Sequence, residues 1–178
     1  LMGNLAGVSG MSRDLFNAAY RWVGHWRGGL ASATIVGCAG FAALSGSSIA
    51  SAVTMGRVAL PEMKRFKYGD SLATGAVAAG GTLGILIPPS TGLIIYAILT
   101  EESIGRLFMA GVIPGILLTC LFLIAIAIVT RLKPELGPVG PISTMKEKWE
   151  SLRRSITIVG IVLATIGGIY LGVFTPVE

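Results

Sequence analysis

The stretch GTLGILIPPSTG, Gly81 to Gly92, decides the fold because it sets two adjacent prolines inside a long run without charged residues. Proline has no backbone N–H, so Pro88 and Pro89 cannot donate to the carbonyls of Gly84 and Ile85 as a continuous helix requires. A helix that enters this stretch must therefore break halfway along the run.

Composition places the whole chain in a membrane. Its 178 residues are 53% hydrophobic and 13% charged, with a mean hydropathy of +0.77, whereas soluble domains carry about 25% charged residues. The net charge of +5 comes from short basic clusters between apolar runs, which is typical of membrane topology and not of a nucleic-acid-binding face. We expect an all-α membrane protein with no nucleic-acid partner.

Long uncharged segments define the spans, and a spanning helix needs about 20 residues. The first two segments are too long for one straight crossing, and each is interrupted near its centre. The interruption in the first is LSGSSIAS, Leu44 to Ser51, and in the second it is the proline pair. The segments run from Gly28 to Gly56, Ser71 to Thr100, Leu107 to Thr130 and Ser155 to Val177.

Charge placement distinguishes the two interrupted segments. Both ends of the first are basic, and Lys and Arg gather on the cytoplasmic side, so residues 28–60 are predicted to form a re-entrant hairpin with its tip at 45–48. The second, residues 69–100, ends at Glu101 and Glu102 and should cross outward as a discontinuous helix broken at 84–90. Residues 103–132 then return and 155–178 cross outward again, which leaves only Arg106 outside among the Lys and Arg residues.

Two further regions complete the predicted organisation. Residues 1–27 are predicted to form an arm with an amphipathic helix at the cytoplasmic interface, with Tyr20, Trp22 and Trp26 at headgroup depth. Residues 133–154 are rich in Pro and Gly and then charged, which is typical of a cytoplasmic linker between two helical units.

The two breaks offer complementary chemistry. The prolines free carbonyl oxygens, and they also force Ile87 into an extended conformation. The SGSS turn adds the hydroxyls of Ser45, Ser47 and Ser48, and the positive end of a helix dipole near Ser48. Such features suit Na+ beside an anionic substrate near the midplane, as in transporters with broken helices. The alternative is that the prolines only bend a helix and the small residues only pack helices together.

Other chemistries find little support in the residues. His25 is the only histidine and lies among aromatic and basic neighbours, which argues against an intramembrane serine hydrolase that uses Ser45, Ser47 or Ser48. No carboxylate falls inside an uncharged segment, which favours Na+ over H+ as the coupling ion. We therefore expect a transporter and not an enzyme.

The segment from Ala43 to Leu118, with its SGSS and IPPS motifs, resembles the large membrane subunit of tripartite ATP-independent periplasmic (TRAP) transporters. The ending GGIYLGVFTPVE, Gly167 to Glu178, resembles the start of that family's second half. The resemblance implies two inverted repeats, each with a hairpin and a discontinuous helix, that work by an elevator motion.

It also implies Na+-coupled uptake of small organic acids, such as C4-dicarboxylates or sialic acid, in the bacterial inner membrane. The expected partners are a periplasmic solute-binding protein and a small four-helix membrane subunit. Matching motifs place a Na+ site at Ser45, Ser48, Gly84, Ile87 and Pro89, with the last three acting through carbonyls. Ser47 and Ser90 would lie near the substrate.

Because the family's second hairpin should follow Glu178, we expect that this chain holds the first repeat, one ion site and half of the substrate site. It should not transport alone. The alternative within the same class is a Na+/carboxylate symporter with a similar hairpin that works without a binding protein.

Overall fold

The computed structural model describes residues 11–140 and, after them, residues 144, 145, 147–151, 153, 156, 160, 164, 167 and 168. The first part of the predicted arm, residues 1–10, lies outside the described residues, as does most of the predicted span over 155–178. The described part is helical and contains no strand, only one isolated bridge between Arg27 and Val139. The prediction of an all-α protein is confirmed for this part.

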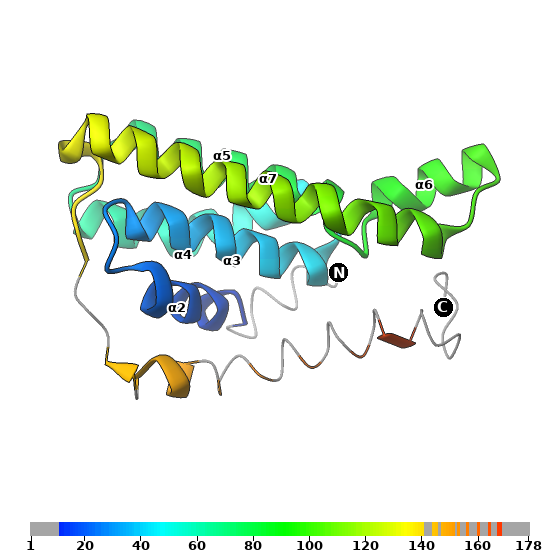
Figure 1. The fold of residues 1–178 in the computed structure, drawn as a ribbon, viewed down its shortest axis with the longest axis horizontal. Coiled ribbons are helices and arrows are strands. Elements are labelled where there is room, and N and C mark those ends of the chain that lie inside the picture. Colours follow the sequence, from blue (N-terminus) through cyan, green and yellow to red (C-terminus); the bar gives the residue numbers. More distant parts are fainter. Residues whose placement is uncertain are drawn as a thin grey trace.

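The helices form an elongated bundle (Figure 1). Helices α3, α4 and α5 pack against one another, α2 lies on the hairpin that α3 and α4 form, and α7 runs along α5 and α3. Helix α6 continues past the end of the hairpin beside α7. The bounds are α2 Met11–Val23, α3 Gly29–Ser45, α4 Ser48–Arg65, α5 Asp70–Leu86, α6 Thr91–Thr100, α7 Ile104–Leu132 and the 3-10 turn η1 Pro134–Leu136.

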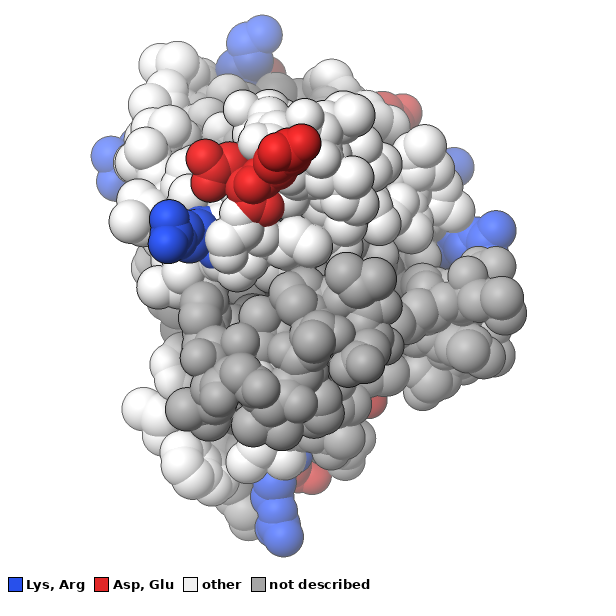
Figure 2. All heavy atoms as spheres, turned by 90° about the vertical axis from the view of Figure 1, so that its right-hand side faces the viewer, with Lys and Arg blue, Asp and Glu red and all other residues white. Residues whose placement is uncertain are grey.

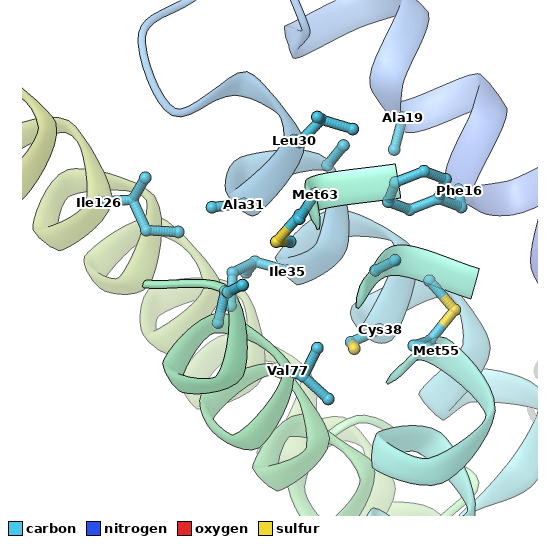
Figure 3. Packing of buried hydrophobic residues seen from close by; sticks show 14 of the residues in the cluster. Phe16, Ala19, Leu30, Ala31, Ile35, Cys38, Met55, Met63, Val77 and Ile126 are labelled. Carbon is cyan, nitrogen blue, oxygen red and sulfur yellow. The ribbon is translucent and has the colours of Figure 1, made fainter. Parts of the chain in front are cut away.

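Helix α3 is the centre of the core because it has no polar face to turn outward. Its side chains are apolar or small from Gly29 to Ser45, and most of them are buried. In the close view, Ile35 and Cys38 of α3 lie among Met55 of α4 and Val77 of α5 (Figure 3). A helix that is hydrophobic all round must be surrounded by other elements, and here α2, α4, α5 and α7 supply that cover.

The amphipathic helix α2 directs its apolar face at the hairpin. Phe16 and Ala19 are buried against α3, whereas Trp22 and Trp26 are exposed. Protein therefore covers much of the apolar face that the sequence analysis directed at the membrane interface. The two exposed tryptophans are of the type found at headgroup depth, and the interfacial position of α2 stays a prediction.

Two stretches of the described chain are long and apolar enough to cross a membrane. The first is α5 with α6, Asp70–Thr100 over 31 residues, and the second is α7 over 29 residues. Large apolar side chains of α7, including Ile113, Leu121 and Ile128, are exposed along its length. Exposure of this kind is expected where lipid covers the protein.

One end of the bundle, which we call the base, holds the start of α3, the end of α4, the start of α5 and the end of α7. Backbone hydrogen bonds from Gly28 N–H to Gly137 O and from Gly69 N–H to Leu136 O join these ends at 3.1 and 3.0 Å. Both ends of the hairpin thus lie on the same side. Arg27 before α3, Lys64 and Arg65 at the end of α4 and Arg131 at the end of α7 therefore lie at the base.

The opposite end carries the turn between α6 and α7, which contains Glu101 and Glu102. Viewed onto this end, acidic side chains cluster among uncharged ones with few basic side chains beside them (Figure 2). This distribution agrees with an outward-facing end under the positive-inside rule. The orientation itself stays a prediction.

Residues 136–140 are more than a passive linker, and we call them the strap. Besides its bonds to Gly28 and Gly69, the strap donates from Gly140 N–H to Gly24 O at 3.1 Å. Tyr68 joins the strap to α3, because its hydroxyl donates to Pro138 O at 2.8 Å and accepts from Leu30 N–H at 3.2 Å. Burial raises the pKa of Tyr68, so its hydroxyl keeps the proton that it donates.

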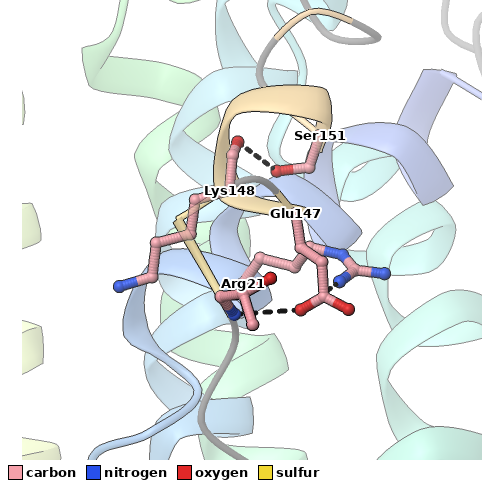
Figure 4. A network of polar contacts seen from close by, with 5 residues as sticks. Arg21, Glu147, Lys148 and Ser151 are labelled. Carbon is pink, nitrogen blue, oxygen red and sulfur yellow. Dashed lines mark hydrogen bonds and ion pairs between the residues drawn. The ribbon is translucent and has the colours of Figure 1, made fainter.

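The chain beyond the strap returns to α2. The sequence TMKE, Thr144 to Glu147, forms a capping box in which Thr144 N–H donates to Glu147 Oε2 at 3.0 Å. Arg21 Nη1 of α2 lies 3.1 Å from the same oxygen (Figure 4). The hydrogen bond from Thr144 and the charge of Arg21 lower the pKa of Glu147, so the carboxylate stays ionised beside α2.

The base and the turn between α6 and α7 lie at opposite ends of the bundle, which predicts a pattern of cysteine labelling. Single cysteines at Arg13 and Lys64, both exposed, should react with a membrane-impermeant maleimide from the same side of the membrane, and a cysteine at Ser103 should react from the other side. The parent protein without an added cysteine is the control. If the cysteines at Arg13 and Lys64 react from opposite sides, the hairpin is wrong.

Replacing Tyr68 by Phe should destabilise the base. The change leaves the buried Leu30 N–H and Pro138 O without their partner, which costs about 1–3 kcal/mol. We expect a lower thermal unfolding midpoint for the full-length protein in detergent. Tyr96→Phe, at an exposed tyrosine of α6, is the matched control and should leave the midpoint unchanged. Equal midpoints for the two variants would show that Tyr68 does not hold the strap.

Candidate functional site

The hairpin tip is a two-residue turn between long helices. Helix α3 ends at Ser45, and Gly46 follows in the left-handed conformation with φ 57° and donates to Ala42 O, which is the usual glycine cap. Ser47 is extended, with φ −136°, and its Oγ accepts from Ala50 N–H at 3.4 Å as the N-cap of α4. The sequence SGS thus encodes one helix end and one helix start.

The proline break is built as the sequence requires. Helix α5 ends at Leu86, and Ile87 is extended with φ −81° and ψ 118°, which confirms the conformation predicted for the residue before a proline. The bond between Pro88 and Pro89 is cis. Ser90 is also extended, and α6 begins at Thr91.

The two interruptions touch each other directly. Thr91 donates to Gly46 O twice, from its N–H at 3.3 Å and from its Oγ1 at 3.0 Å. A Cβ atom added at Gly46 would lie 2.6 Å from Pro89 O, so only glycine allows this approach. A Cβ atom added at Gly84 would lie 2.8 Å from Ser48 N. The turn and the break are therefore two halves of one structure, which we call the tip contact.

Helix α7 closes the other side of the break with glycine as well. A Cβ atom at Gly111 would lie 2.7 Å from Leu86 O, and one at Gly115 would lie 3.0 Å from Ile87 Cγ1. Irregular backbone at membrane depth is tolerated where protein or a water-filled cavity surrounds it. The break meets that condition because the tip and α7 both contact it.

Several serine hydroxyls surround the tip contact. Ser45 Oγ lies 2.9 Å from Ser51 Oγ and donates to Ser47 O at 3.4 Å. Ser90 is completely buried, and its Oγ has no hydrogen-bond partner within the described part of the chain. A buried hydroxyl without a partner costs free energy, so Ser90 Oγ is a group that a bound ligand could satisfy.

The structure brings most of the predicted site residues together. Ser45 and Ser47 flank Gly46 at the tip, and Gly84 contacts the peptide between Ser47 and Ser48. Pro89 and Ser90 face Gly46, since the Cβ position of Gly46 lies 2.6 Å from Pro89 O and 3.6 Å from Ser90 Cα. Ile87 differs, because its contact is with Gly115 of α7.

Two residues at the tip contact were missed by the sequence analysis. Thr91 holds the break to Gly46, and Ser51 is buried and bonded to Ser45. Spacing could have indicated Ser51, because it lies one helical turn after Ser47. No sequence signal indicates Thr91, since its partner is 45 residues away.

Four helix ends meet at the tip contact. Their dipoles favour a cation at some of these ends and an anion at the others. The C-terminal ends of α3 and α5 present carbonyl oxygens that favour a cation, and the N-terminal ends of α4 and α6 favour an anion. Among the described residues no three His, Cys, Asp or Glu side chains group to hold a metal. Neutral oxygens alone suit a hard cation such as Na+ and not a transition metal.

A serine nucleophile here would lack its base. His25 stacks edge-on against Trp26 before α3 begins, whereas the serines follow the other end of this 17-residue helix. At 1.5 Å per residue the two ends are about 25 Å apart. The geometry therefore does not pair His25 with the serines of the hairpin tip.

Comparison with known proteins gives a consistent result. The family described as "Tripartite ATP-independent periplasmic transporter, DctM component" matches residues 1–178. The chain is 43% identical, over its whole length, to the C4-dicarboxylate TRAP transporter large permease protein DctM of Pseudomonas aeruginosa and covers 41% of that protein. It is 36% identical over its whole length to the sialic acid TRAP transporter large permease protein SiaM of Vibrio cholerae, again covering 41%.

A third relative carries the name of a different solute. The chain is 38% identical, over 92% of its residues, to the ectoine/5-hydroxyectoine TRAP transporter large permease protein UehC of Ruegeria pomeroyi and covers 38% of it. The chain thus spans about two fifths of the length of the curated relatives that it matches.

The close approach at Gly84 predicts a strong effect of one methyl group. Gly84→Ala places a Cβ 2.8 Å from the Ser48 nitrogen, and such overpacking costs about 1–3 kcal/mol. We expect a lower unfolding midpoint for the full-length protein. Gly75→Ala in the same helix is the control, because nothing lies within 4 Å of its Cβ position, and its midpoint should be equal or slightly higher. The tip contact is contradicted if both variants unfold at the wild-type temperature.

Proposed function

The chain belongs to the DctM component family of TRAP transporters, and we propose that it carries a Na+ site and one half of the substrate site of a Na+-coupled permease for small organic acids. The observation that carries this proposal is the meeting of four helix ends at the tip contact. It supplies carbonyl and hydroxyl oxygens beside positive helix N-termini.

The Na+ site is proposed at Ser45, Ser48, Gly84, Ile87 and Pro89. The contacts of Gly84 and Pro89 with the hairpin tip support this set of residues. Neither Ser48 nor Ser90 makes a side-chain hydrogen bond to another described residue that would occupy its hydroxyl. Coordination of Na+ would satisfy carbonyls at the break, which otherwise lack N–H partners because of the prolines.

The substrate is proposed to be a small carboxylate, such as a C4-dicarboxylate or sialic acid, near Ser47 and Ser90. Both residues occupy N-cap positions, where a carboxylate is stabilised by the helix dipole. The permeases with similar sequences are named for C4-dicarboxylate, sialic acid and ectoine. Because these names differ in their solute, they leave the choice of acid to the complete site.

The complete protein is proposed to act in the bacterial inner membrane with a small four-helix membrane subunit and a periplasmic solute-binding protein. The tip contact supports an elevator motion, because a site made from four helix ends persists only if these ends move together. The strap and Tyr68 tie the bases of α3, α5 and α7 to one another, so this part of the chain would move as one body.

The alternative of a binding-protein-independent Na+/carboxylate symporter makes a different prediction for uptake. We favour the tripartite system because the matching permeases are named as components of TRAP transporters. The tripartite system is supported if proteoliposomes take up labelled succinate or sialic acid only when the binding protein is present. Equal uptake without the binding protein would support the alternative.

Binding of Na+ can be tested before the substrate is known. The full-length protein should unfold at a higher temperature in NaCl than in KCl of equal ionic strength, since a ligand at 100 times its Kd stabilises by about 2.7 kcal/mol. Ser48→Ala should reduce this difference, whereas Ser103→Ala, at an exposed serine before α7, should not. Equal midpoints in NaCl and KCl for the wild type, or an unchanged difference in Ser48→Ala, would contradict the proposed site.

A further inference from the structure

A cavity of about 480 Å³ opens between the start of α3 and the last turns of α7, at the base of the bundle. It lies at the opposite end of α3 from the tip contact and therefore belongs to a different site. Its lining includes Arg27, Arg131 and Trp26 at the base and Leu123, Ile124 and Ala127 further along α7. One wall of the cavity is thus basic and the other is apolar.

The backbone positions of the two arginines are set by the fold. Arg27 forms the isolated bridge with Val139 of the strap, and its carbonyl oxygen lies 3.3 Å from Thr130 Oγ1, whose shortest hydrogen bond goes to Ile126 O within α7. Arg131 is in the last turn of α7. Neither guanidinium forms an ion pair within the described part of the chain, and no Asp or Glu lines the cavity there. The cavity therefore presents two uncompensated positive charges at fixed backbone positions.

The surroundings are those of a membrane interface. Trp26 is 55% exposed, and apolar side chains of α7 are also exposed, both in the lining of the cavity at Ile124 and outside it at Ile128. Tryptophan and arginine at the end of an apolar helix are typical of headgroup depth, and an apolar exposed surface is typical of the hydrocarbon region. In the predicted topology, with the base on the cytoplasmic side, the cavity would span the boundary between these two layers.

We propose that this cavity binds one anionic phospholipid. The headgroup phosphate would lie between Arg27 and Arg131, which can hold phosphate oxygens with paired N–H donors. An acyl chain would lie along Leu123, Ile124 and Ala127. Basic pockets between transmembrane helices on the cytoplasmic side are suited to such headgroups, whereas a small organic acid would leave the apolar wall of the cavity uncovered.

The test uses the purified full-length protein and native mass spectrometry with added phosphatidylglycerol or phosphatidylcholine. The wild type should retain one phosphatidylglycerol at least tenfold more tightly than phosphatidylcholine. The Arg27→Gln/Arg131→Gln protein should lose this preference. The Arg13→Gln/Arg106→Gln protein loses the same amount of charge at exposed positions outside the cavity. It should keep the preference for phosphatidylglycerol.

A second variant keeps both arginines and separates a lipid from a free anion. Ala127→Trp fills the apolar wall, and it should weaken phosphatidylglycerol retention at least tenfold. Unchanged retention in this variant, with displacement by inorganic phosphate, would mean a free-anion site and would overturn the lipid assignment. A wild-type protein that shows no preference for phosphatidylglycerol would also overturn the lipid assignment. That result is expected if another protein segment covers the cavity. If the Arg27→Gln/Arg131→Gln protein fails to fold, the lipid selectivity of the wild type and the phosphatidylglycerol retention of Ala127→Trp test the proposal.

Discussion

The described structure depends on one contact, in which two interrupted stretches of backbone supply hydrogen-bond partners to each other. The carbonyl of Gly46 at the hairpin tip accepts both donors of Thr91 at the start of α6, and Gly84 of α5 lies against the peptide that starts α4. Each break alone would expose unpaired polar groups at membrane depth, which is costly. Together the breaks allow two helices to stop in the middle of the bundle.

Small residues make this contact possible. Gly46, Gly84, Gly111 and Gly115 bring backbone to within contact distance of backbone or of Ile87, where an added Cβ atom would overlap. The groups that these residues bring together at the tip contact are helix ends, carbonyls and hydroxyls.

The sequence was sufficient where the signal is local. Two prolines determine that Ile87 is extended, and SGS determines the cap of α3 and the start of α4. Basic residues at both ends of the first segment indicated a hairpin, and its two ends do lie together at the base. The membrane orientation, the ion and the substrate stay proposals.

The sequence was insufficient where the partner is distant. The pairing of Thr91 with Gly46 and of Tyr68 with Pro138 joins residues 45 and 70 positions apart, and neither leaves a periodic pattern. The proline and glycine of the strap predict a linker but give no sign of its contact with Gly28. The apolar face of α2 fits lipid or a neighbouring helix equally well, because a sequence alone cannot distinguish these two apolar partners.

The central claim is that the SGSS turn and the IPPS break form one ion site. The most direct measurement is a pair of cryo-electron microscopy maps of the full-length protein, one in NaCl and one in choline chloride of equal ionic strength. Our account predicts density between Ser48 and the carbonyl of Gly84 in NaCl only, with the tip contact present. Maps without density at this position in either salt, or with the turn separated from the break, would contradict it.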